Sequence, residues 1–274
     1  MNWCDQLAAI SSNPENISRF YLTPEHKRCN TLVAQWMQEA GMETWVDAAG
    51  NICGRYDAKN ACAKTLVLAS HLDSIPNAGA YDGILGVLIA IAVVEQLYQN
   101  DITLPYAIDI IGFGDEEGTR FGSTLLGSRA VAGTWNPDWW ELKDRNGISL
   151  QQAFIDFGLE PENIHSAARN PDDLLAYLEV HIEQGPVLED ENLALGIVTA
   201  IAGARRFACP AAPRDGSRWA ICWPNARVSP KMPMTKSWRK GRALSCCAQA
   251  WPLHPCNANL AHATPTRISP SMPR

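Results

Sequence analysis

The stretch TLVLAS, residues 65–70, runs directly into His71 and decides the fold of this chain. It lacks the polar alternation of a half-exposed strand, so it is typical of a strand buried on both faces of a parallel sheet. Residues 106–112 form a second apolar stretch, and the mostly apolar residues 83–98 between the two predict a helix. Strand, helix and strand in succession indicate an α/β layered fold.

Further elements are expected on both sides of this unit. Thr23 and Pro24 match the capping residue and the first residue of a helix, and the apolar pattern extends this helix to Ala40. We expect a second flanking helix at 149–157 and further strands at 43–47, 51–56, 174–183 and 195–202.

The composition of the chain changes after Arg206. Residues 1–206 contain 13 basic and 28 acidic residues, whereas residues 207–274 contain ten basic residues and one acid. This last segment also holds ten of the 18 prolines and five of the nine cysteines, and it lacks helical or strand periodicity. We therefore divide the chain into a folded part, 1–206, and a basic tail rich in Pro, Cys and Trp, 207–274.

The tail has three alternative interpretations. Its basic, Pro-rich composition is typical of a disordered tail, but four tryptophans and five cysteines are unusual in one. Enrichment in Arg, Pro, Trp, Cys and Ser is what a GC-rich gene yields out of frame, so a frameshift after about residue 207 is favoured. A zinc cluster of Cys246, Cys247, His254, Cys256 and His262 is disfavoured because paired CxxC spacing is absent.

The overall composition argues against several classes of protein. The chain is 46% hydrophobic and 19% charged, which allows a sizeable core, and no apolar stretch is long enough to predict a membrane span. The net charge of −6 argues against a nucleic-acid partner. The absence of a secretory signal pattern and the unpatterned cysteines predict a cytoplasmic protein with reduced thiols. The cysteines expected to be packing residues are Cys4, Cys29, Cys53 and Cys62.

Polar side chains follow the expected strands at the points where each strand ends. In chain order they are His71, Asp73, Asp82, Glu116, Glu117 and His181. Ligands of open α/β sheets bind at these ends, and imidazole with carboxylate suits a divalent transition metal such as zinc. Each residue alone has a structural explanation, such as a helix cap for Asp82. Their joint order predicts a metal centre, which holds two ions if one carboxylate bridges them.

Three blocks of this sequence resemble a known family: SHLDSIPNAGAYDG (70–83), GFGDEEGTRFGSTLLGSRAVAG (112–133) and EVHIEQGPVLE (179–189). They are similar to the allantoate amidohydrolase and N-carbamoyl-L-amino-acid hydrolase (hydantoinase/carbamoylase) branch of the dinuclear-zinc aminopeptidase-like amidohydrolases. The resemblance covers residues 1 to about 207. It implies a three-layer α/β/α catalytic domain that hydrolyses a C–N bond, other than a peptide bond, in a linear carbamoyl or ureido compound. The opening segment, residues 7–26, resembles allantoate amidohydrolases, and N-carbamoyl-L-amino-acid hydrolase or β-ureidopropionase activity is the alternative.

The resemblance also implies roles for single residues. His71 and His181 would hold one metal ion, Glu117 would hold the other, and Asp82 would bridge the two. Glu116 would be the general base, which takes a proton from water and passes it to the leaving nitrogen.

Further side chains would support this chemistry. Asp73 would accept a hydrogen bond from the far ring nitrogen of His71, and Gln184 and Arg206 match substrate contacts. The family uses two divalent ions per subunit, either zinc or manganese, cobalt or nickel. Its members are homodimers that act on small carbamoyl or ureido substrates, which implies no nucleic-acid and no membrane partner.

The sequence departs from the family after Phe207. There the family inserts a smaller α/β domain, which dimerises and covers the site, and then resumes the catalytic domain with the last His ligand. Neither that domain's Gly-His-Ala-Gly-type motif nor a recognisable context for His254 or His262 is present, so the second metal would lack one imidazole. We therefore expect a truncated, marginally stable and inactive product with an exposed sheet edge. A noncatalytic protein that keeps one metal is the alternative.

Overall fold

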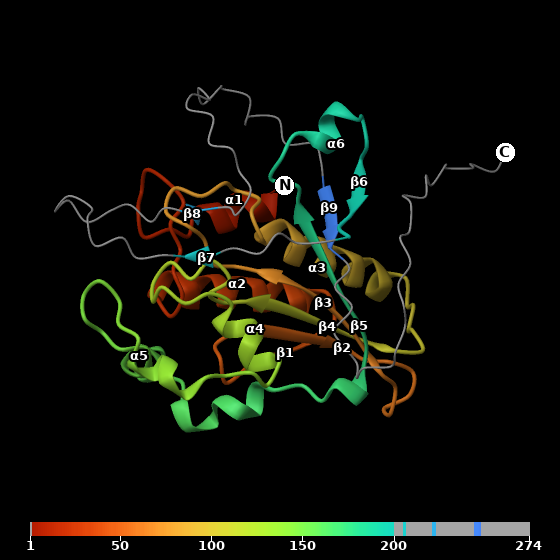
Figure 1. Ribbon diagram of the computed structural model, residues 1–274. Helices are drawn as coiled ribbons and strands as arrows, with labels where there is room; N and C mark the ends of the chain where they lie inside the picture. The colour runs from red at the N-terminus through yellow and green to blue at the C-terminus, as the bar shows by residue number, and fades with distance from the viewer. Residues whose placement is uncertain (1, 200–204, 207–220, 223–243, 248–274) are drawn as a thin grey trace, which may run out of the picture.

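Seven strands form one mixed sheet in the computed structural model, which describes residues 2–199, 205–206, 221–222 and 244–247 (Figure 1). The strands are β1 (Glu43–Val46), β2 (Ile52–Tyr56), β3 (Thr65–His71), β4 (Ala107–Phe113), β5 (Leu174–Ile182), β6 (Leu195–Ile197) and β9 (Leu244–Cys247). Their order across the sheet is β1-β2-β4-β3-β5-β9-β6. A separate pair is formed by β7 (Arg205–Arg206) and β8 (Ile221–Cys222).

Helices cover both faces of this sheet. They are α1 (Asn2–Ala8), α2 (Pro24–Glu39), α3 (Ile84–Gln99), α4 (Leu126–Val131), α5 (Leu150–Phe157) and α6 (Val187–Asp190), with 3₁₀ turns η1 (Pro137–Glu141), η2 (Pro161–Ala167) and η3 (Pro171–Asp173). Helices α1, α2 and α3 share one core with the sheet, whereas Val131 of α4 packs on the other face against Val67 and Phe113. The three-layer α/β/α arrangement predicted from the sequence is therefore confirmed.

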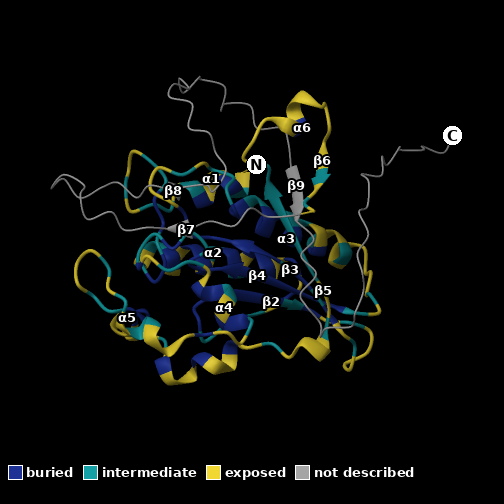
Figure 2. Cartoon of the chain, in the orientation of Figure 1, coloured by how far each residue is buried: buried dark blue, intermediate teal, exposed yellow. Residues whose placement is uncertain are grey.

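The central strands run in parallel and bring their carboxyl ends to one edge. Strand β3 pairs in parallel with β4, where His71 lies opposite Phe113, and with β5, where Leu68 lies opposite Leu178. Continued by three residues, the second register brings His181 level with His71. All seven residues of β4 are buried (Figure 2). The sheet edge that receives the predicted ligands is thus built on the best-packed part of the molecule.

The elements lie within one or two residues of their expected bounds, with one exception. The strand expected at 195–202 ends at Ile197, residues 198–199 are not in a strand, and residues 200–202 lie outside the described residues. Leu195 and Ile197 are 60% and 69% exposed, so no core packing supports a longer strand here.

The cysteine prediction is wrong at one position. Cys4, Cys29 and Cys53 are buried and free, as expected of packing residues. Cys62 is exposed because it lies in the polar loop between β2 and β3.

The structure describes only short pieces of the segment 207–274. Strand β8 pairs with β7, and β9 lies between β5 and β6, antiparallel to the first and parallel to the second. The proposed zinc-cluster residues His254, Cys256 and His262 lie outside the described residues. The division of the chain at residue 206 and the origin of the tail stay predictions.

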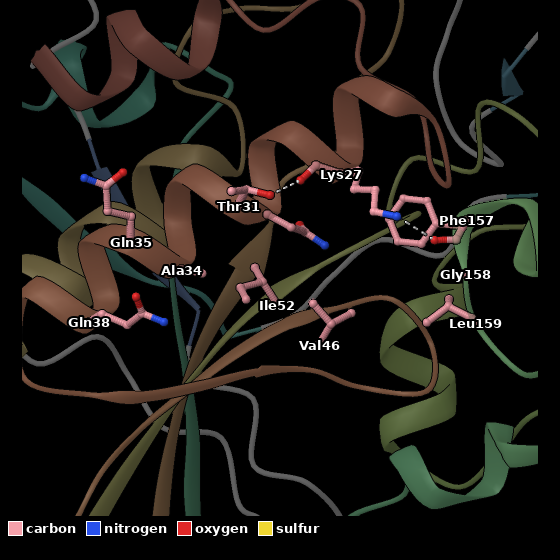
Figure 3. A pocket seen from close by; sticks show the side chains of 11 residues that line it. Lys27, Thr31, Ala34, Gln35, Gln38, Val46, Ile52, Phe157, Gly158 and Leu159 are labelled. Carbon is pink, nitrogen blue, oxygen red and sulfur yellow. Dashed lines mark hydrogen bonds between the residues drawn. The ribbon is translucent and has the colours of Figure 1, made fainter.

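None of the helices in the described ranges is long and apolar enough to cross a bilayer. A hollow of about 500 Å³ lies between α2 and the end of α5, where the Lys27 ammonium donates to the carbonyl of Phe157 (Figure 3). None of the candidate ligands lines this hollow.

Candidate metal centre

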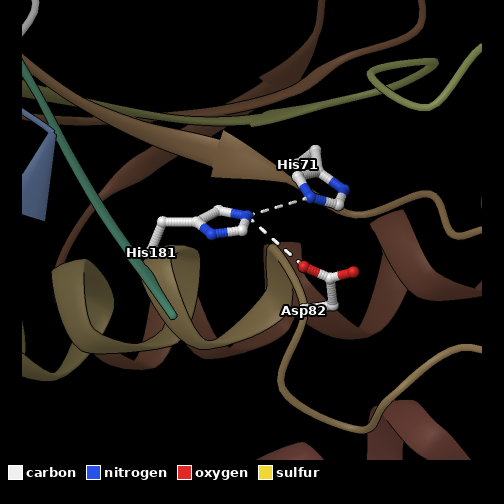
Figure 4. Close-up of side chains that lie close together, drawn as sticks. All are labelled: His71, Asp82 and His181. Atoms are coloured by element: carbon white, nitrogen blue, oxygen red, sulfur yellow. Dashed lines mark hydrogen bonds and ion pairs between the residues drawn. The ribbon is translucent and has the colours of Figure 1, made fainter. Parts of the chain in front are cut away.

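Two imidazoles from different strands face each other at the carboxyl edge of the sheet. His71 ends β3 and His181 lies near the end of β5, and their Nε2 atoms are 3.4 Å apart (Figure 4). The Nδ1 atom of His71 lies 3.0 Å from the Asp73 carbonyl, and that of His181 lies 2.8 Å from the Ile182 carbonyl. Each Nδ1 faces an acceptor and therefore carries the proton. Both Nε2 atoms then face the same space, where a bound cation would take the place of an Nε2 proton.

Asp82 adds a carboxylate to this pair. Its Oδ1 atom lies 3.4 Å from His181 Nε2 and accepts a 2.7 Å hydrogen bond from the Gln184 side chain. Gly83, which follows, has φ of +67°, and a Cβ atom there would lie 2.4 Å from His71 Nε2. A glycine is required at this turn because the His71 ring occupies the space of a side chain.

Asp73 holds the other half of the centre. Its two carboxylate oxygens accept hydrogen bonds from the backbone N–H groups of Glu116 and Glu117, at 2.9 and 3.1 Å. One of these oxygens lies 3.6 Å from His71 Nδ1. Asp73 therefore fixes the loop of the glutamate pair relative to the His71 ring, although its backbone carbonyl makes the shorter contact with the ring.

The acidic groups of the site shift one another's pKa. Burial raises the pKa of Glu116, with the opposing charge of His71 limiting the shift. Burial and the charge of Glu116 raise the pKa of Glu117 to about 7. Burial lowers the pKa of His71, but interaction with Asp73 and the charges of Glu116 and Asp82 outweigh it and raise the pKa to about 10. The site thus holds an excess of negative charge that favours a cation.

The geometry of these side chains fits a divalent ion. Ligand atoms of His71, Asp82 and His181 all lie within 4.8 Å of one another, and so do those of His71, Glu116 and Glu117. Imidazole nitrogen and carboxylate oxygen are ligands of zinc and of related transition metals. The structure therefore brings together His71, Asp82, Glu116, Glu117 and His181, from the ends of three neighbouring strands and the turn before α3.

The two predicted substrate contacts have different outcomes. Gln184 lies at the centre, but there it donates to Asp82. Arg206 lies in β7, and its side chain lies outside the described part of the chain.

The sequence analysis missed one buried support of the glutamate loop. The Asn51 side chain accepts a hydrogen bond from the Gly114 N–H and donates to the Gly127 carbonyl, at 2.9 and 3.2 Å. It also donates to Asp47, whose carboxylate accepts from two backbone N–H groups. The Asp-Ala-Ala-Gly-Asn run between β1 and β2 was the available signal, because such residues are typical of a tight turn.

The layered sheet with candidate ligands at its carboxyl edge defines an α/β domain with a candidate metal centre. The sequence model of Peptidase family M20/M25/M40 matches residues 67–272, past the point where the resemblance was expected to end. The chain belongs to this family, whose members are metal-dependent.

Individual relatives indicate which branch of the family this chain resembles. N-carbamoyl-L-amino acid amidohydrolase of Geobacillus stearothermophilus is 43% identical over 199 residues, which are 72% of this chain and 49% of that protein. Allantoate deiminase of Arabidopsis thaliana is 39% identical over 206 residues, 74% of this chain and 39% of that protein. The crystal structure of a hydantoinase/carbamoylase family amidase from Burkholderia ambifaria matches with a TM-score of 0.64 and 35% identity, covering 70% of this chain and 46% of that one. The chain thus spans less than half the length of these relatives.

Proposed function

We propose that this chain carries the metal-binding half of an amidohydrolase site that cleaves a linear carbamoyl or ureido C–N bond. The observation that carries the proposal is the convergence of His71, His181 and Asp82 beside the pair Glu116 and Glu117. Relatives named for N-carbamoyl amino acids and for allantoate supply the substrate class. Allantoate is the favoured substrate, and an N-carbamoyl-L-amino acid is the alternative.

The five residues divide between ligands and base. His71, His181 and Asp82 would hold one divalent ion, and Glu117 would contribute to a second, with Asp82 shared as the family resemblance implies. A bound divalent ion would polarise the substrate carbonyl and lower the pKa of water.

Glu116 moves the proton in this scheme. Water adds to the carbamoyl carbon, the C–N bond breaks, and Glu116 passes the proton from water to the leaving nitrogen. Its raised pKa supports this role, because a base poised nearer to neutral pH returns a proton more readily. The backbone bond to Asp73 keeps Glu116 facing the site.

We expect the chain by itself to bind one ion tightly and not to turn over substrate. The first ion would have three ligands that lie together in the structure, whereas the resemblance leaves the second only Asp82 and Glu117. The sequence shows no match to the family's further imidazole or to its dimerisation domain, and the side chain of Arg206 lies outside the described part of the chain. A cytoplasmic location, a homodimeric ancestor and a small-molecule partner remain part of this proposal.

A metal titration combined with an activity assay tests the proposal. Zinc binding is measured by competition with a chromophoric chelator, and turnover is measured with allantoate and with N-carbamoyl amino acids. One tight equivalent without turnover is the expected result, and no tight equivalent would contradict the metal centre. Turnover that Glu116→Gln abolishes and Glu95→Gln on α3 does not would overturn the prediction of inactivity while supporting the chemistry.

A further inference from the structure

A buried arginine lies behind the metal centre without a carboxylate partner. Arg19 has no exposed surface, and no ion pair joins it to an acidic side chain of the described ranges. A buried charge is costly unless it is paired or fully hydrogen-bonded. The guanidinium is held through Nε and Nη1, whereas its buried Nη2 atom has no hydrogen-bond partner among the described residues.

The partners of Arg19 are backbone carbonyls from two separate segments. Its Nε atom donates to the Leu72 carbonyl at 2.7 Å. Its Nη1 atom donates to the carbonyls of Leu7 and Ile10, at 2.8 and 2.9 Å, at the end of α1. Helix carboxyl ends carry partial negative charge, which favours a cation there.

The backbone of Arg19 binds the same strand end as its side chain. Its N–H donates to the Ser74 hydroxyl, and its carbonyl accepts from the Ser74 N–H, both at 2.9 Å. Three hydrogen bonds thus hold Leu72 and Ser74, the two neighbours of Asp73. Asp73 in turn binds the N–H groups of Glu116 and Glu117 and faces the His71 ring.

We infer that Arg19 is a positioning residue of the metal centre, which joins helix α1 to the Leu72–Ser74 segment and so aims His71 and the glutamate pair. This inference rests on the proposed function only for its metal-binding readout. The contacts themselves are independent of any ion. Lysine cannot replace the arginine fully, because one ammonium nitrogen cannot serve both Leu72 and the carbonyls of α1.

Hydrogen exchange tests the inference without any metal. In Arg19→Met, the amides of Glu116 and Glu117 are expected to exchange at least about tenfold faster than in the parent chain. Arg19→Lys should give an intermediate rate, and it serves as the second variant if Arg19→Met does not fold. Arg169→Met is the matched control. Arg169 forms an ion pair with Asp109 in the middle of β4, away from the hydrogen bonds of Asp73.

Cobalt binding provides the second readout. The Kd for Co²⁺ should rise about 10–100-fold in Arg19→Met, with a changed visible spectrum, at a temperature where far-ultraviolet circular dichroism matches the parent. Arg169→Met should leave both unchanged. Unchanged exchange at Glu116 and Glu117 in both Arg19 variants would overturn the inference. If the parent chain binds no cobalt, the proposed metal centre is wrong. If exchange at Glu116 and Glu117 is still faster in the Arg19 variants, the positioning role of Arg19 stands.

Discussion

The two halves of the metal centre differ in how firmly the protein holds them. His71 and Asp73, at the end of β3, are 3% and 2% exposed, and both are tied to buried neighbours. The His181 side chain, on β5, is 17% exposed, and Gln184 beyond it is exposed. Strand β5 is no less apolar in sequence than β3, yet none of its residues is fully buried. Apolar sequence therefore does not by itself decide burial, which depends on what packs against the strand.

The comparison extends to the surface around each half. Core residues surround β3 and β4, whereas Val187 of α6 and Leu195 and Ile197 of β6 are more than half exposed (Figure 2). We expect the β3 half to be arranged before any ion binds and the β5 half to be arranged partly by the ion. The following predictions test this difference, in order of decreasing effect.

Removal of the Asp73 carboxylate should have the largest effect. Asp73→Ala leaves the N–H groups of Glu116 and Glu117 without their acceptor, so we expect the free energy of unfolding to fall by about 3–5 kcal/mol. Cobalt affinity should fall as well. Denaturant unfolding and cobalt titration are the measurements.

A matched carboxylate separates stability from metal binding in this experiment. Asp144 also accepts two backbone N–H groups, from Asn146 and Ile148, and contributes no ligand. Asp144→Ala should lower stability but leave the Kd for cobalt unchanged. Equal loss of cobalt affinity in both variants would mean that Asp73 does not position the metal ligands.

The free energy of unfolding should depend on pH through His26, which lies on α2. This residue is fully buried, and its Nδ1 accepts from the Leu22 N–H, so burial lowers its pKa to about 4 from 6.5. The unfolded chain takes up a proton between these values and the folded chain does not. The resulting stability is complete above pH 6.5 and is lost as pH falls towards 4, by about 3 kcal/mol in total.

The variant His26→Asn isolates this contribution, because it keeps an acceptor for Leu22 without the titration. Unfolding is measured in the presence of a chelator between pH 4 and 7. The parent should lose stability more steeply than the variant, whereas parallel curves would contradict a neutral buried His26.

Gly83 tests how closely the turn fits against His71. In Gly83→Ala, the new Cβ atom would lie 2.4 Å from His71 Nε2, in addition to the strain of a positive φ. Gly122 has a similar φ of +75° and open space around its Cβ position. We expect Gly83→Ala to be about 1–3 kcal/mol less stable than Gly122→Ala, with the larger loss of cobalt affinity. Equal stability and affinity would show that the His71 ring moves away freely.

The smallest effect is expected on the exposed half. Gln184→Ala removes the 2.7 Å bond to Asp82, but the side chain is exposed, so stability should change by less than about 1 kcal/mol. The Kd for cobalt should rise less than in Asp73→Ala. A greater rise would mean that the β5 half is the more tightly arranged one.

The local sequence pattern predicted most of the helices and strands. The helix that begins at Pro24 follows from its Thr23 cap, and strands β3 and β4 follow from apolar stretches. The hydrogen bonds from Arg19 to Leu72 and from Gly114 to Asn51 could not be foreseen, because they join residues more than 50 positions apart in the chain. The early end of β6 had no local signal either.

The sequence by itself determined the alternation of strands and helices and the kinds of ligand placed after them, because periodicity and residue chemistry are local properties. Only the tertiary structure decided that His71 and His181, 110 residues apart, present their Nε2 atoms to one another. The parallel register of β3 with β5 and the carbonyls facing each Nδ1 set that orientation. These depend on long-range pairing, for which no stretch of sequence carries a signal of its own.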